Sequence, residues 1–90
     1  MTESQVRGLA TIHFAQLSRA VDEWPVRPPE WQQAAHLSDV QLTLTPKELT
    51  CLCQELLAVI ARHSREAPSR HDPGVAESVV LQFQAFRRPV

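Results

Sequence analysis

The chain has 90 residues, with nine basic and ten acidic side chains and a formal net charge of −1 at pH 7. This near balance argues against a free-standing nucleic-acid binder, which normally carries a basic surplus. The sequence has no apolar run near the roughly 20 residues that span a bilayer, and it starts without the features of a signal peptide. We therefore expect a soluble, cytoplasmic protein with one small domain, residues 1–90.

The first predicted element is an amphipathic helix over residues 3–24. Apolar residues recur there at three- and four-residue spacings, which places them on one side of a helix. Pro25 ends the helix, because proline lacks a backbone donor and disfavours helix in the residue before it. Residues 25–31 contain three prolines and predict a stiff connector.

The next two elements are a strand and a second helix. Apolar and polar residues alternate over residues 39–44, which is typical of a strand with one buried face. Thr45 then provides an N-cap, Pro46 suits the first helical position, and Glu48 completes a capping box. The predicted helix covers residues 46–64, with an apolar face made of Leu49, Leu52, Cys53, Leu56, Val59, Ile60 and His63.

Residues 65–77 show no periodicity and predict a loop, and residues 79–86 alternate again as a second strand. The order predicts an α+β fold: a helix–strand–helix–strand unit with a small two-stranded sheet. A right-handed parallel crossover is the default topology, and the long loop also allows an antiparallel return. Because two strands make a poor sheet, we expect a dimer partner or a domain outside this chain to complete it.

Catalytic motifs are missing from the sequence. Gly8 and Gly74 are the only glycines, so a glycine-rich phosphate loop is excluded, and the Gly-x-Ser-x-Gly pattern does not occur. The sequence therefore predicts no enzyme, no catalytic residues and no cofactor.

The weak candidates for a metal site are Cys51, Cys53 and His63. Thiolates and imidazoles bind soft cations, but residues two apart on a helix point about 200° apart, so two sulfurs cannot reach one ion without unwinding. Cys53 also falls on the apolar face, where free cysteine is commonly a small buried hydrophobe. No metal site is predicted, although a metal-responsive module remains an alternative.

The large apolar side chains predict an interaction surface. So short a chain buries only about 60–65% of its unfolded surface, and aromatic residues are enriched in interfaces. The predicted interface residues are Phe14, Leu17, Leu81, Phe83 and Phe86. A small-molecule effector is a further alternative, with a pocket lined by Trp24, Trp31 and His63.

Two segments carry a family resemblance: residues 36–49, which contain Leu44-Thr45-Pro46-Lys47-Glu48-Leu49, and residues 79–86, which end in Ala85-Phe86. Together they resemble the region after the winged helix in ArsR-like helix-turn-helix transcriptional regulators. Lys47 stands where a carboxylate is common, and Arg87 stands where proline is expected. The helix-turn-helix itself is absent.

The resemblance implies the accessory C-terminal part of a regulator, without its own DNA-reading element. Such a part would form a homodimer or dock on a winged-helix DNA-binding domain, and it would make no direct contact with nucleic acid. We therefore expect a non-catalytic module for dimerisation or regulation.

Overall fold

The computed structural model describes residues 1–70 and 74–90, with the side chains of residues 67–70 outside the description. The chain divides into two units, Met1–Val40 and Gln41–Val90. Each unit is described below by itself. The single domain predicted for residues 1–90 stays a prediction.

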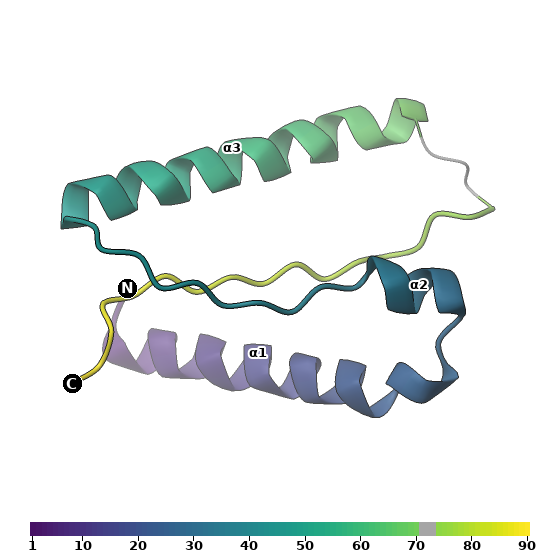
Figure 1. The fold of residues 1–90 in the computed structure, drawn as a ribbon, viewed down its shortest axis with the longest axis horizontal. Coiled ribbons are helices and arrows are strands. Elements are labelled where there is room, and N and C mark those ends of the chain that lie inside the picture. The colour runs from purple at the N-terminus through teal and green to yellow at the C-terminus, as the bar shows by residue number, and fades with distance from the viewer. Residues whose placement is uncertain (71–73) are drawn as a thin grey trace. The chain divides into compact units, whose positions relative to one another are not determined.

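The first unit consists of a long helix followed by two short ones (Figure 1). Helix α1 spans Glu3–Asp22, the 3₁₀ helix η1 spans Trp24–Val26, and α2 spans Pro29–Ala34. The long helix thus ends two residues before the predicted boundary. Two short helices occupy most of the predicted connector, because proline is tolerated in a first helical turn, where its missing N–H has no intrahelical partner.

Short-range hydrogen bonds define the ends of these helices. Thr2 and Gln5 form a capping box at the start of α1: the Gln5 amide donates to Thr2 Oγ1 at 3.2 Å, and the Thr2 amide donates to Gln5 Oε1 at 2.8 Å. Further along, Gln32 Nε2 donates to the Trp24 carbonyl at 2.7 Å and joins α2 to η1. Most of the order in this unit therefore comes from contacts that are close in sequence.

The second unit contains one long helix, α3, which spans Pro46–Arg70. It begins at the predicted residue, and the predicted capping box is confirmed: the Glu48 amide donates to Thr45 Oγ1 at 3.1 Å, and the Thr45 amide donates to Glu48 Oε1 at 3.0 Å. The helix extends six residues past the predicted end, into the predicted loop of residues 65–77. Its apolar periodicity stops near His63, but Arg65, Glu66 and Ala67 are good helix formers and favour a continued helical backbone. Residues 71–73 of the predicted loop lie outside the described residues.

The predicted two-stranded sheet is wrong. Among residues 1–70 and 74–90 no strand is found, and both residues 39–44 and residues 79–86 form irregular segments, drawn as plain traces in Figure 1. The α+β class is thus replaced by a helical chain with extended connections. Alternation reports a preference for burying one face, but a strand also needs a neighbour for its backbone hydrogen bonds, and a lone pair of strands is marginal in water.

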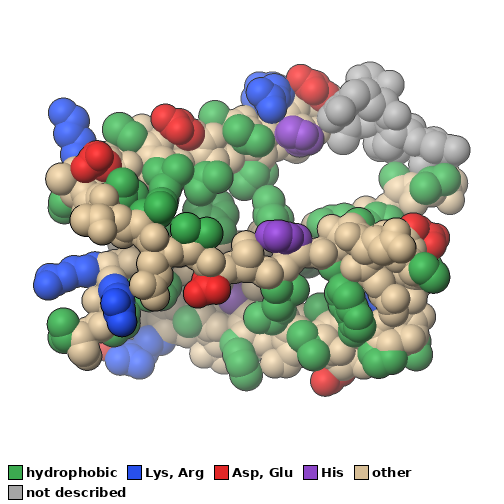
Figure 2. Space-filling model, viewed as in Figure 1, with side chains coloured by type: hydrophobic (Ala, Val, Ile, Leu, Met, Phe, Trp, Pro, Cys, Tyr) green, Lys and Arg blue, Asp and Glu red, His purple; other side chains and the backbone are tan. Residues whose placement is uncertain are grey.

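The side chains of the chain are unusually exposed. No side chain of the described residues is buried, and Figure 2 shows hydrophobic side chains at the surface of both units. The chain exposes 8560 Å². Two separate compact monomers of about 5 kDa, roughly the mass of one unit, would together expose only about 6,400 Å². The helices are well formed, but in neither unit does the described part bury a hydrophobic side chain.

Candidate functional site

The predicted interface residues lie on both units, and all of them are exposed. Phe14 and Leu17 lie on α1, where they are 71% and 40% exposed. Leu81, Phe83 and Phe86 lie on the irregular segment after α3 and are 68%, 39% and 69% exposed. Each of these side chains therefore leaves apolar surface available, but no single surface containing all five is established.

Helix α3 has an apolar face that is covered unevenly. Its half-buried apolar residues are Leu49, Leu52, Cys53 and Ile60. On the same helix, Leu56 and Val59 are 42% and 45% exposed. A turn of 3.6 residues puts successive side chains about 100° apart, so exposed Leu56 lies about 20° from Leu49, and half-buried Leu52 lies about 20° from exposed Val59. Half-buried and exposed residues thus alternate across the apolar face, and both Leu56 and Val59 leave apolar surface uncovered.

An open hollow lies in the second unit, between the start of α3 and the segment that precedes it. It has a volume of about 430 Å³ and is lined by Leu42, Leu44, Lys47, Glu48, Cys51, Leu52 and Glu55. Three leucines make its apolar part, and two carboxylates and one ammonium group stand among its charged lining. Sequence analysis missed this hollow, although Leu42 and Leu44 alternate on one side of the chain directly before the helix.

A second hollow lies along α1 and is lined by Met1, Gln5, Gly8, Leu9 and Ile12. It is open at Gly8, where a Cβ atom would meet nothing within 4 Å. Sequence analysis missed this hollow as well, although Gln5, Gly8 and Ile12 follow one another at three- and four-residue spacings.

The cap of α3 also sets the electrostatics at its N-terminus. The hydrogen bond from the Thr45 backbone, followed by that from its side chain, holds the pKa of Glu48 below its ordinary value, with a smaller opposing effect of desolvation. A carboxylate at a helix N-terminus also interacts favourably with the helix dipole. The role of Glu48 in this structure is therefore to stabilise the start of α3.

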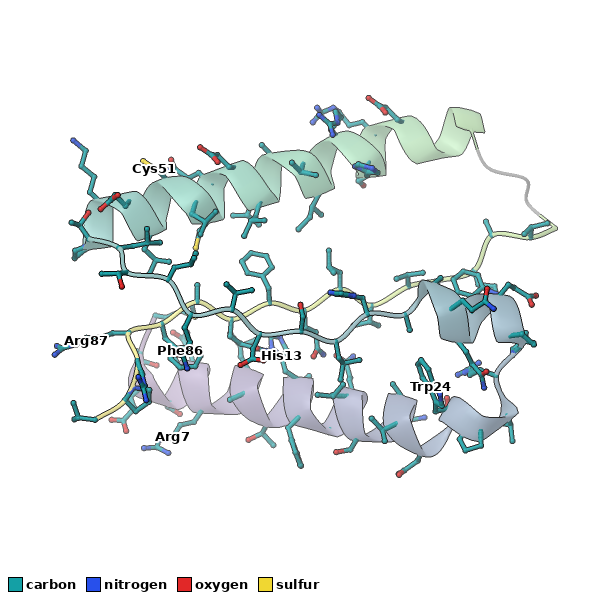
Figure 3. The ribbon with its side chains drawn as sticks, viewed as in Figure 1. Arg7, His13, Trp24, Cys51, Phe86 and Arg87 are labelled. Atoms are coloured by element: carbon teal, nitrogen blue, oxygen red, sulfur yellow. The ribbon has the colours of Figure 1, made fainter. Side chains whose placement is uncertain are left out.

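The three weak metal candidates lie on α3 but are not brought together. Cys51 and Cys53 are free cysteines, one exposed and one half-buried, and Figure 3 shows Cys51 near the start of the helix. His63 lies ten residues beyond Cys53, about 15 Å along the axis at 1.5 Å per residue. Its Nδ1 donates to the Val59 carbonyl at 3.1 Å. Within the described residues, no group of three potential ligands lies close enough to hold a metal ion.

The residues predicted to line an effector pocket belong to different units. Trp24 lies in η1 (Figure 3) and Trp31 lies in α2, both in the first unit. His63 belongs to α3 in the second unit. No pocket made of these three residues is established.

Comparisons with known proteins give no relative. No protein-family model matches the chain, and neither the curated proteins nor the solved structures contain a match. Among the described residues, no helix combines the length and the apolar character that crossing a membrane requires.

Proposed function

We propose that this chain is a non-catalytic interaction module that completes its core against a second copy of itself or a partner domain. The observation that carries the proposal is the absence of any buried side chain among the described residues, together with the exposed leucine, valine and phenylalanine side chains of both units. Hydrophobic burial is the main favourable term in folding and in most protein association. A chain that leaves this surface exposed gains stability by covering it.

The size of the two units supports the same proposal. They contain 40 and 50 residues, which is close to the size of about 40 residues below which domains usually need disulfides, metals or oligomerisation to be stable. The two cysteines, Cys51 and Cys53, are both free. Association is therefore the means of stabilisation that the surface of this chain favours.

The proposed setting is a transcriptional regulator with a winged-helix domain. The support is the resemblance of residues 36–49 and residues 79–86 to the accessory region of ArsR-like regulators. In this setting the chain dimerises or docks on the DNA-binding domain, and the net charge of −1 favours a role away from the phosphates. We propose the cytoplasm as its compartment, where free cysteines stay reduced.

Sedimentation equilibrium combined with circular dichroism tests the proposal. We expect the mass of the chain to exceed that of the 10.2 kDa monomer at micromolar concentration. On dilution, helical signal and cooperativity of unfolding should fall together, because folding and association are coupled. A monomer that stays fully helical and unfolds cooperatively at every concentration contradicts self-association. If it also fails to bind a winged-helix domain, the interaction module is excluded.

A further inference from the structure

Charged side chains lie beside the apolar face of α3 in a defined order. Glu55 and Arg62 are seven residues apart, which places them about 20° apart around the helix and about 10.5 Å apart along it. Both lie on the Val59 side of the apolar face, and both side chains are exposed. The ion pairs found among the described residues join Glu3 to Arg7 and Glu23 to Arg27, so neither Glu55 nor Arg62 takes part in them.

This order of charges distinguishes between the two ways in which α3 can pair with an identical helix. In an antiparallel pair related by a twofold axis near residue 58, Glu55 of each copy lies opposite Arg62 of the other. The same register places Leu56 opposite Val59, so the two exposed apolar side chains cover each other. In a parallel pair, Glu55 of one helix lies next to the opposite flank of the other helix. That flank carries Cys53 and Ile60 and offers Glu55 no basic residue.

We propose that α3 pairs antiparallel with α3 of a second copy of this chain, with two Glu55–Arg62 ion pairs flanking a Leu56–Val59 contact. The proposal rests on the proposed function and specifies its partner and geometry. The pairing is isologous, as in most homodimers: the same surface serves both copies. Each end of the contact brings Leu52 opposite His63, whose ring is held against its own helix by the hydrogen bond to Val59.

The hollow at the start of α3 is consistent with this register. Glu55 and Leu52 line it together with Leu42 and Leu44. A second α3 that runs antiparallel brings Arg62 of the second copy to Glu55 at the rim of this hollow. The pairing covers only about three helical turns, so it sets the orientation of the dimer, and the other exposed apolar segments supply the remaining buried area that a stable dimer needs.

A charge-swap series measured by sedimentation equilibrium in low salt tests this proposal. Glu55→Arg and Arg62→Glu each replace two attractive pairs by two repulsive ones, and we expect each to weaken self-association about tenfold. The double variant E55R/R62E restores the attraction and should associate like the wild type. An equimolar mixture of the two single variants should form heterodimers, because every facing pair is then opposite in charge. Both residues are exposed, so circular dichroism should show unchanged helix content.

The outcomes separate this proposal from the proposed function. If the wild type associates but the single swaps change nothing, or the double swap fails to restore the dimer, the antiparallel α3 pair is excluded and association through another surface stands. If the wild type is a folded monomer at all concentrations, self-association fails together with the pairing. Recovery in both the double variant and the mixture supports the proposed register.

Discussion

Thr45 and Glu48 each accept a hydrogen bond from the backbone amide of the other, at 3.1 Å and 3.0 Å. This reciprocal pair satisfies two amides that have no intrahelical partner and lies directly next to the hollow at the start of α3. The cap therefore determines where α3 begins.

Removing the cap should destabilise α3. Thr45→Ala deletes the hydroxyl that accepts from the Glu48 amide, and we expect the free energy of unfolding to fall by about 0.5–2 kcal/mol. Thr45→Ser keeps the acceptor and serves as the control. Urea unfolding followed by circular dichroism measures both. Equal stability of the alanine and serine variants would show that the hydroxyl contributes nothing.

The cap should also depend on pH through Glu48. Because its pKa in the folded chain lies below its ordinary value, the ionised carboxylate stabilises the fold above about pH 4.3, the pKa of an unperturbed glutamate. This contribution is lost as the pH falls below that value, through the folded pKa. Glu48→Gln keeps a side chain that caps, as Gln5 does in α1, but does not titrate. The difference in stability between wild type and variant should shrink on acidification; a difference that does not change with pH would contradict this role.

Gly8 should be a site where a substitution stabilises the chain. It lies inside α1, and a Cβ atom there meets nothing within 4 Å. Alanine restricts the unfolded chain and favours helix by about 0.8–1 kcal/mol relative to glycine. Gly8→Ala should therefore raise the free energy of unfolding by about that amount. Ala10→Gly is the matched opposite change and should lower it. A loss of stability in Gly8→Ala would indicate that another surface packs closely against this position.

Leu56 and Leu57 provide a matched pair for the proposed assembly. They are 42% and 54% exposed and point about 100° apart on α3. Changing either to alanine alters helix propensity equally. Covering Leu56 of both copies in the proposed pair contributes about 1.5–3 kcal/mol per dimer, so Leu56→Ala should weaken association by more than tenfold, whereas Leu57→Ala should change it by less than about threefold. Sedimentation equilibrium measures both variants, and equal effects would place the contact elsewhere.

The sequence by itself determined the parts of this protein that depend on residues within about four positions of each other. Thr45, Pro46 and Glu48 predicted where the second long helix begins, because a capping box is local chemistry. The apolar spacing predicted which side of that helix avoids water. Phe14 and Phe86, which the sequence predicted for an interface, are exposed. Their part in an interface stays a prediction.

Only the tertiary structure decided the fate of residues 39–44 and residues 79–86. Their alternation favours strands, yet a strand exists only when another segment lies in register to accept its hydrogen bonds. It also decided that α3 continues to Arg70 and that Leu56 and Val59 stay exposed on its apolar face. The physical reason is the same in each case: caps and helical turns form between close neighbours, whereas pairing and burial depend on segments that are distant in the sequence.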